Sequence, residues 1–208
     1  MQRITDAALI VVDVQNDFLP GGALAVAGGD EVIEPINALM ERFETIVLTA
    51  DWHPENHMSF ACNHEGHEAF EVVEVSYGKQ VLWPMHCVAG TWGAEFAPEL
   101  DTKAAALIVR KGMHSHCDSY SAITEADGKT VPGLAGWLRE RGLRKVYICG
   151  LAMDFCVAMS AVDAAGAGFE TYLVKDATVA IDTSGSLELA QEACCRAGVK
   201  MIAMSEIG

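Results

Sequence analysis

The sequence predicts a three-layer α/β/α fold built on a mainly parallel sheet of six strands. Short apolar runs recur at intervals too long for hairpins, and helix-length amphipathic segments separate several of them. Strands that alternate with helices need crossover connections, which place parallel strands in a central layer and helices on both of its faces. No repeat, linker or low-complexity tract divides the chain, so we expect a single domain over residues 1–208.

Each expected strand is a short apolar run of the kind that is buried on both faces of a sheet. The runs cover residues 8–14, 45–50, 105–109, 145–150, 171–174 and 200–203. The expected helices show apolar residues at helical spacing, and they cover residues 30–43, 133–141, 155–167 and 186–197. Residues 51–103 sustain no such period although they hold five of the seven histidines, and a stretch of this length is usually functional.

Composition and charge exclude several classes of protein. With 51% hydrophobic and 21% charged residues the chain is neither disordered nor a coiled coil. Its net charge of −15 would repel both a nucleic-acid backbone and an anionic membrane surface. The start of the chain lacks the pattern of a signal peptide, and the seven cysteines form no Cys-x-x-Cys pair. We therefore expect a cytoplasmic protein with reduced thiols that binds neither nucleic acid nor membrane.

Polar side chains follow three of the expected strands, where the ligand crevice of an open α/β sheet lies. Asp13 interrupts the apolar run of the first strand, and a buried carboxylate there needs a partner. The second strand runs into Asp51 and His53, a pair that one divalent cation can bridge. The third runs into Lys111. Taken one at a time, a capping carboxylate, a hydrogen-bonded Asp–His pair and a solvated lysine explain these residues as well.

Cys156 has the most specific location. The fourth strand, 145–150, leads through a short turn into the helix expected over 155–167, so Cys156 lies at a helix N-terminus above the sheet. The macrodipole and free amides there favour a thiolate and can hold an oxyanion. The alternative is a small core residue, and we assign that role to Cys149, Cys194 and Cys195. Together with Asp13 and Lys111, Cys156 would give a base, a charge partner and a nucleophile over one crevice.

Several motifs in combination resemble the isochorismatase-like cysteine hydrolases, and within them the nicotinamidase (pyrazinamidase) group, over about residues 7–204. They are VDVQNDF at 12–18, GGALAV at 21–26, DWHP at 51–54, WPMHCV at 83–88, GT at 90–91, RKG at 110–112, DSYS at 118–121 and GLAMDFCV at 150–157. The resemblance implies the isochorismatase-like hydrolase fold. It also implies conversion of nicotinamide to nicotinate and ammonia, and of pyrazinamide to pyrazinoate, through a thioester intermediate in NAD salvage.

The resemblance further implies a role for individual residues. The catalytic residues would be Asp13, Lys111 and Cys156. The amides of Ala152 and Cys156 would form the oxyanion hole, with a cis peptide between Leu151 and Ala152. Phe18, Trp83 and Tyr120 would wall the pocket. Asp51, His53 and His86 would hold one divalent metal ion, with zinc preferred and iron or manganese as alternatives.

Two positions depart from the family pattern, and two other functions stay open. Pro54 alters the spacing after His53, so His57 is placed outside the metal shell; Ile123 stands where an aromatic residue is common.

A relative with the same fold could act on another small amide, an N-carbamoyl compound or isochorismate. A protein of a different class could store metal in its histidine cluster and use Cys156 as a redox sensor. A homo-oligomer is compatible with the sequence.

Overall fold

The computed structural model describes residues 3–207. Within them, a six-stranded sheet has the order β5-β2-β1-β6-β7-β8, and every pair of neighbours is parallel. Its strands are β1 (Ile4–Val12), β2 (Phe43–Asp51), β5 (Leu107–Lys111), β6 (Lys145–Gly150), β7 (Glu170–Thr178) and β8 (Lys200–Ile202). The predicted parallel sheet is therefore confirmed.

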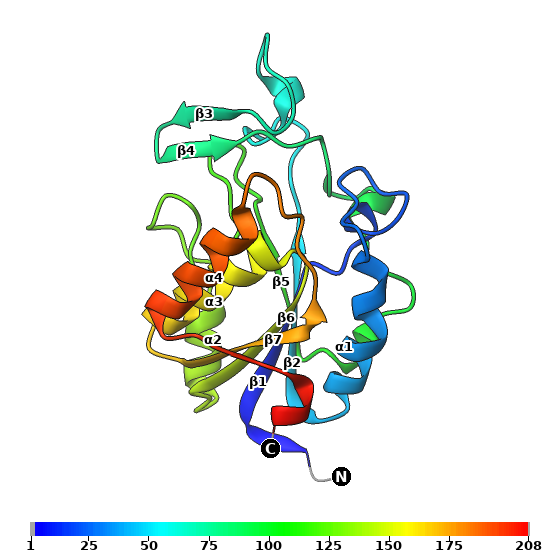
Figure 1. Cartoon of the computed structure of the whole chain (residues 1–208), viewed down its shortest axis with the longest axis vertical. Helices are drawn as coiled ribbons and strands as arrows, with labels where there is room; N and C mark the ends of the chain where they lie inside the picture. The colour runs from blue at the N-terminus through cyan, green and yellow to red at the C-terminus, as the bar shows by residue number, and fades with distance from the viewer. Residues whose placement is uncertain (1–2, 208) are drawn as a thin grey trace.

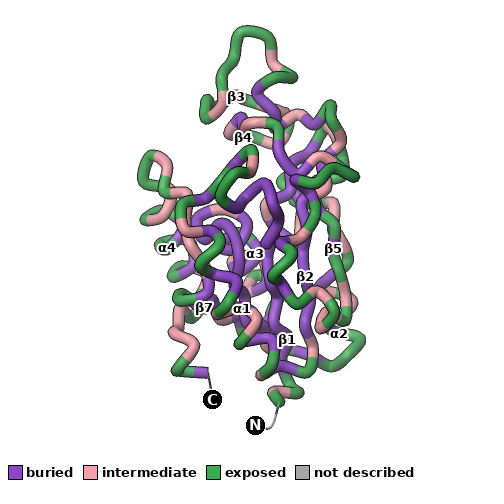
Figure 2. The backbone as a smooth tube through the Cα atoms, turned by 90° about the vertical axis from the view of Figure 1, so that its right-hand side faces the viewer, coloured by how far each residue is buried: buried purple, intermediate pink, exposed green. Residues whose placement is uncertain are grey.

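Helices cover both faces of this sheet (Figure 1). They are α1 (Ile33–Met40), α2 (Leu134–Glu140), α3 (Ala158–Gly166) and α4 (Ser186–Ala197). Alternate residues of β1 face opposite sides: Leu9 packs in a core with α1, whereas Ile10 packs in a second core with α2, α3 and α4. Figure 2 shows that the central strands are buried along nearly their whole length. The three-layer prediction is thus confirmed.

Several predicted boundaries are wrong: β1 begins at Ile4, β5 lies at Leu107–Lys111 and β7 runs to Thr178. The ends of the first helix and of the first strand have a local reason. The helix expected over 30–43 begins with a 3₁₀ turn at Gly29–Val32 and ends at Met40. Phe43 instead opens β2, where its fully buried ring packs 5.1 Å from Tyr147. The first strand ends at Val12 and not at residue 14, because Asp13 has a φ of 49° that turns the chain out of the sheet.

The third helix, α3, also begins differently from the prediction. Met153–Val157 forms a π-helical turn, and the regular α3 starts only at Ala158. Such turns inside or before α-helices are frequent at functional sites. Cys156 therefore lies in the irregular turn that leads from β6 into α3.

The long irregular segment forms a lobe over the carboxyl ends of the strands (Figure 1). It holds several 3₁₀ turns and a two-stranded hairpin of β3 (Val72–Val75) and β4 (Gly78–Val81), which pair antiparallel outside the main sheet. Within the lobe, parallel bridges pair His53 with Val88 and Phe60 with Trp83. The segment thus folds back over the crevice, as the predicted metal set requires.

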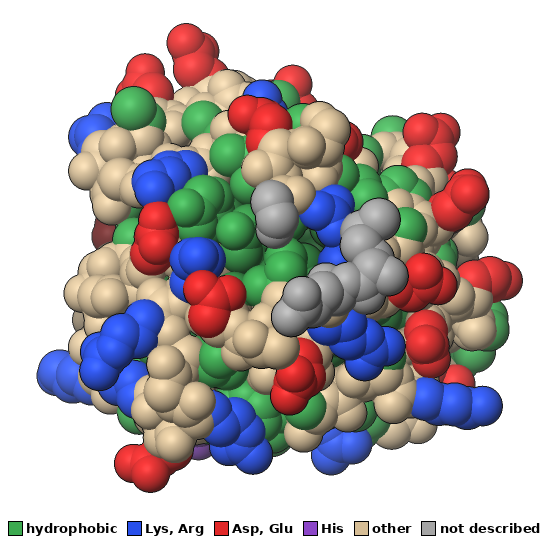
Figure 3. Space-filling model, turned by 90° about the horizontal axis from the view of Figure 1, so that it is seen from below, with side chains coloured by type: hydrophobic (Ala, Val, Ile, Leu, Met, Phe, Trp, Pro, Cys, Tyr) green, Lys and Arg blue, Asp and Glu red, His purple; other side chains and the backbone are tan. Residues whose placement is uncertain are grey.

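On the face seen from below, Lys and Arg side chains are interrupted by Asp and Glu around a hydrophobic area (Figure 3). Across residues 3–207, no helix is both long enough and apolar enough to cross a membrane. All seven cysteines are free thiols. Cys149 and Cys194 are buried as predicted, whereas Cys195 is exposed, so its assignment to the core is wrong.

Candidate active site and metal centre

Lys111 joins the polar groups at the strand ends into one cluster. It ends β5, and its ammonium is fully buried. Its Nζ lies 2.8 Å from Asp13 Oδ2, 2.5 Å from Asp51 Oδ1, 2.9 Å from the Ser119 carbonyl oxygen and 3.3 Å from Cys156 Sγ. The two carboxylates raise the pKa of Lys111 more than burial lowers it, so the amine is charged. The structure thus brings together the three residues predicted to be catalytic.

Asp13 is held in place by the neighbouring strand. Its amide donates to the Thr49 carbonyl oxygen, and the Thr49 hydroxyl donates to Asp13 Oδ1 at 2.5 Å. Burial raises the pKa of this carboxyl to about 6, against the lowering effect of Lys111. A carboxyl with a pKa near neutrality can accept and return a proton under physiological conditions. Asp13 therefore has the properties of a general base.

Cys156 faces the cavity at the end of the π turn, but its thiol is not preactivated. Burial raises the pKa of Cys156 well above its usual value, and although Lys111 lowers it, Asp13 and Asp51 raise it further. The expectation that the helix terminus favours a resting thiolate is therefore wrong, because desolvation and two nearby carboxylates outweigh it. A nucleophilic attack by this sulfur therefore requires that the proton leave at the same time. One oxygen of Asp13 lies within 4.8 Å of the sulfur and can receive it.

Backbone amides flank the thiol in the turn. The peptide bond between Leu151 and Ala152 is cis, as the resemblance implies. Within the described residues, no acceptor is bound to the Ala152 amide, although the neighbouring Leu151 amide donates to the Val12 carbonyl oxygen and the Met153 amide to that of Val179. The Ala152 amide, which borders the cavity, is therefore available to a ligand.

The predicted metal residues lie together beside this cluster. Asp51 Oδ2 is 3.6 Å from His53 Nε2 and 3.9 Å from His86 Nε2, and all three side chains are buried. His53 Nδ1 lies 2.9 Å from the Gly112 carbonyl oxygen, and His86 Nδ1 lies 2.7 Å from that of Pro84. A carbonyl oxygen can only accept, so each Nδ1 carries the hydrogen and each Nε2 presents a lone pair. This arrangement fits a divalent cation.

His57 belongs to a different hydrogen-bond system. Its Nε2 lies 3.2 Å from the Cys117 carbonyl oxygen, and its Nδ1 lies 2.7 Å from the Ser59 hydroxyl. Burial lowers the pKa of His57 to about 4, so the ring is neutral. Its ring packs 4.3 Å from that of His53. His57 could still join His53 and Asp118 as a ligand set, but both of its nitrogens already have partners.

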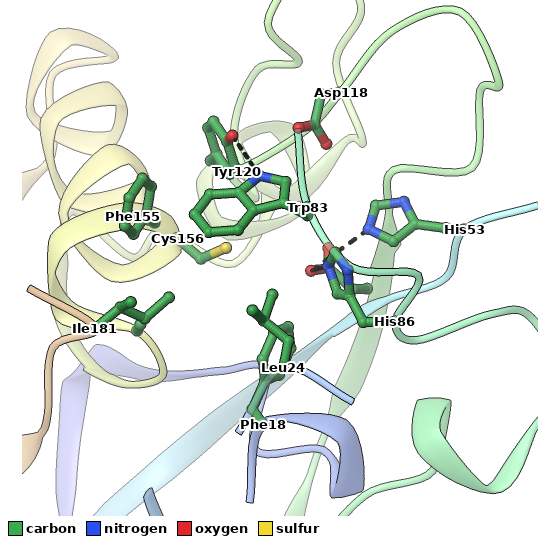
Figure 4. A pocket seen from close by; sticks show the side chains of 12 residues that line it. Phe18, Leu24, His53, Trp83, His86, Asp118, Tyr120, Phe155, Cys156 and Ile181 are labelled. Carbon is green, nitrogen blue, oxygen red and sulfur yellow. Dashed lines mark hydrogen bonds and ion pairs between the residues drawn. The ribbon is translucent and has the colours of Figure 1, made fainter. Parts of the chain in front are cut away.

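A cavity of about 350 Å³, including the space at its mouth, opens over Cys156 (Figure 4). The three predicted wall residues, Phe18, Trp83 and Tyr120, all line it. Sequence reasoning did not single out four further lining residues, namely Leu24, Asp118, Phe155 and Ile181. Cys156 and the two histidines of the metal set border the same space, so a small flat ligand can reach both at once (Figure 4).

Comparison with known proteins identifies the family. The isochorismatase domain pattern matches residues 7–202, nearly the whole chain. The chain belongs to the isochorismatase family. A nicotinamidase of Acinetobacter baylyi is 54% identical over 207 residues, which cover 100% of this chain and 97% of that protein.

Solved structures of the isochorismatase family show the same architecture. An Acinetobacter baumanii nicotinamidase/pyrazinamidase has a TM-score of 0.96 at 53% identity, covering 98% of each chain. A protein of L. infantum in complex with nicotinate has a TM-score of 0.85 at 38% identity, covering 99% of this chain and 96% of the other. A Pyrococcus horikoshii pyrazinamidase in complex with zinc has a TM-score of 0.77 at 38% identity, covering 96% and 99%.

Two residues that sequence reasoning did not single out support the metal set of this isochorismatase-family chain. Gln15 Nε2 donates to the Asp51 carbonyl oxygen and Gln15 Oε1 accepts from the Asp51 amide, each at 2.8 Å. Asp17 Oδ2 accepts from the Cys87 amide at 2.7 Å, next to His86 in the chain. Both lie within the 12–18 motif, so that motif positions the predicted metal residues as well as supplying Asp13.

Proposed function

We propose that this protein is a nicotinamidase, an amide hydrolase that converts nicotinamide to nicotinate and ammonia through a thioester on Cys156. The observation that carries the proposal is the contact of Lys111 with both Asp13 and Cys156 at the edge of a cavity that also presents a two-histidine, one-carboxylate set. Nicotinamidases with 54% and 53% identity over nearly the full chain support the substrate.

The first half-reaction forms the thioester. Asp13 takes the proton of Cys156 as the sulfur attacks the carboxamide carbon, and the Lys111 ammonium stabilises the developing thiolate. The oxygen of the tetrahedral adduct accepts hydrogen bonds from the amides of Ala152 and Cys156. Losing one such donor costs about 3 kcal/mol of transition-state stabilisation in other hydrolases. Asp13 then returns its proton to the nitrogen, the C–N bond breaks, and ammonia leaves.

The second half-reaction hydrolyses the thioester. Asp13, ionised again after ammonia has left, takes a proton from a water molecule that attacks the acyl carbon. The same two amides hold the second tetrahedral oxyanion. When the C–S bond breaks, the proton on Asp13 passes to the Cys156 sulfur, and the product acid leaves and gives up its remaining proton to water as nicotinate. A pKa of about 6 suits Asp13 to this exchange, since it must act as base and acid in turn.

The proposed cofactor is one divalent metal ion, with zinc preferred over iron or manganese. Asp51, His53 and His86 would hold it, because each imidazole presents its Nε2 lone pair to the same carboxylate. When bound, the ion supplies a Lewis-acidic contact for the pyridine nitrogen of the substrate. Phe18, Trp83 and Tyr120 would pack against the pyridine ring.

The alternatives from the sequence are less well supported. Cleavage of an N-carbamoyl compound or of isochorismate would not need a metal set at the far side of the pocket. A metal-storage protein should gather several histidines, yet within residues 3–207 His64, His67, His114 and His116 belong to no group of three ligands. A redox sensor needs an accessible thiolate, whereas Cys156 is a buried thiol with a raised pKa.

The cellular role follows from the reaction. Nicotinamide hydrolysis returns the pyridine ring to NAD synthesis, so we propose a role in NAD salvage. Seven free thiols without a disulfide suit a reducing compartment, and we place the enzyme in the cytoplasm.

An assay of ammonia and nicotinate release from nicotinamide tests this proposal. The metal-loaded protein should release both in equal amounts, and Cys156→Ala should release neither. Cys195→Ala, which changes an exposed thiol remote from the cavity, is the matched control and should retain full activity. Absence of ammonia release from the metal-loaded wild type would refute the proposed function.

A further inference from the structure

The hairpin of β3 and β4 carries one feature that the proposed reaction does not use. The residues of its two strands are exposed or half-buried except Gln80, a residue that is only 2% exposed. A buried side-chain amide is costly unless its donors and acceptor are satisfied. The hydrogen-bond partners of the Gln80 side chain therefore show which residues the hairpin contacts.

Gln80 uses both ends of its amide. Its Oε1 accepts from the Tyr77 hydroxyl at 2.8 Å. Its Nε2 donates to Asp118 Oδ2 and to the Val81 carbonyl oxygen, both at 2.7 Å, and it lies 3.3 Å from the Tyr120 hydroxyl. The bond to a carboxylate is of the stronger, charge-assisted kind.

Two further contacts, from the residues that flank β4, reach the same segment. Trp83, two residues after β4, donates from Nε1 to the Tyr120 hydroxyl at 2.8 Å, and the Tyr77 hydroxyl accepts from the Asp118 amide at 3.2 Å. The hairpin and Trp83 thus form hydrogen bonds with both ends of the segment 118–120, namely Asp118 and Tyr120. Asp118 and Tyr120 line the cavity, so these hydrogen bonds hold residues of the pocket wall itself (Figure 4).

The middle of that segment reaches the charged cluster. The Ser119 carbonyl oxygen accepts from Lys111 Nζ at 2.9 Å. Lys111 also has Asp13 and Asp51 as partners, so its position does not depend on Ser119 alone. Tyr120 has no such additional support: within the described residues its hydroxyl is bound by Trp83 and Gln80 only. Loosening the segment should therefore disturb the wall more than the ammonium.

We propose that Gln80 is a positioning residue that fixes the 118–120 segment, and through it the Tyr120 wall, in the conformation that binds the aromatic ring of the substrate. This inference rests on the proposed function for its kinetic consequence, but the fixing of the segment stands without it. A wall packs against the ring equally in the ground state and in the transition state. Its loss therefore raises KM and leaves kcat nearly unchanged.

The test uses two substitutions at Gln80 and one control on the same strand. Gln80→Met keeps the volume but removes the donors and the acceptor. Gln80→Glu keeps the shape but sets a carboxylate against Asp118. Lys79→Gln changes the adjacent exposed residue and leaves these bonds intact. All three are studied as full-length, metal-loaded protein.

Hydrogen exchange gives the readout that does not depend on activity. Amides of residues 118–122 should exchange faster in both Gln80 variants than in wild type and in Lys79→Gln, while amides of β1 and β6 keep their rates. Unchanged exchange at 118–122 would overturn the proposal. An equal rise throughout the protein would also overturn it, because Gln80 would then contribute only to global stability.

Kinetics with nicotinamide give the second readout. KM should rise by up to about tenfold in Gln80→Met, because substrate binding then has to reorder the segment that this charge-assisted hydrogen bond held, and kcat should change less than about threefold. A fall in kcat at constant KM would contradict a role in the wall. If wild type turned over no nicotinamide, the proposed function would fail, whereas the exchange experiment would still decide whether Gln80 fixes the segment.

Discussion

Lys111 Nζ lies 2.5 Å from Asp51 Oδ1, while the other oxygen of Asp51 faces the two histidines of the metal set. The ammonium that contacts Cys156 is therefore paired with a metal-set carboxylate as well as with Asp13. Three buried charges are arranged so that one cation lies between two anions. The proposed catalytic residues and the metal set consequently share one electrostatic unit.

Replacing Lys111 tests this shared unit. Lys111→Met leaves Asp13 and Asp51 buried without their common cation, which costs about 3–5 kcal/mol of unfolding free energy for a broken buried pair. Turnover should fall at least about 1,000-fold, and the loss should not add to that of Cys156→Ala, because the residues act together. Urea unfolding and nicotinamide turnover measure the two effects. Near-normal turnover would return Lys111 to a structural role.

The pH dependence of kcat/KM tests Asp13 as the base. Its pKa is raised to about 6, and a base must be ionised, so kcat/KM should fall as the pH drops through about 6. The stability of the fold should change in the opposite direction. Because the folded state binds the Asp13 proton more tightly than the unfolded state, protonation of Asp13 adds to the unfolding free energy at low pH, and this addition is lost as the pH rises through about 6. Metal content should be measured at each pH to separate loss of the ion.

Thr49→Val gives a directional control for that assignment. The Thr49 hydroxyl donates to Asp13 Oδ1 and lowers the pKa of Asp13. Valine keeps nearly the shape of threonine but lacks the hydroxyl. The substitution should therefore shift the acid limb of the kcat/KM profile to higher pH. A limb that stays in place would mean that another group controls it.

Metal binding should depend on His86 and not on His57. His86→Ala removes a ligand, so metal content after dialysis should fall and the affinity should drop by more than about 10-fold, with weaker binding of nicotinamide. His57→Gln, whose ring nitrogens already have other partners, should retain the ion. In both variants Cys156 should still react with a small alkylating reagent. Full metal content in His53→Ala and in His86→Ala would place the site elsewhere, with His57, His64 and His67 to be tested next.

The sequence predicted the sheet well because its strands are buried on both faces and appear as continuous apolar runs. It located the helix boundaries less well, because tertiary contacts decide them. Phe43 has the correct spacing for the helix expected before it, yet its burial against Tyr147 places it in β2. Asp13 leaves the first strand because of its backbone turn, which no local pattern announces.

Distance information was also missing from the sequence. The motifs indicated Asp51 and Lys111 separately, but their direct contact follows from the pairing of β2 with β5, which places these two residues in register. The raised pKa of the Cys156 thiol could not be predicted either, because it depends on burial and on the carboxylates of Asp13 and Asp51, at the ends of two other strands. Its position at a helix N-terminus, taken alone, predicts a lowered pKa.

Trapping of the acyl intermediate tests the central claim most directly. Metal-loaded protein is mixed with nicotinamide, quenched in acid during turnover and digested, and the peptides are mapped by mass spectrometry. The account predicts a nicotinoyl thioester on the peptide that contains Cys156 and on no other cysteine, with none formed by Asp13→Asn. Nicotinate formation without any adduct on Cys156, or an adduct of equal yield on Cys87, Cys117 or Cys194, would contradict it.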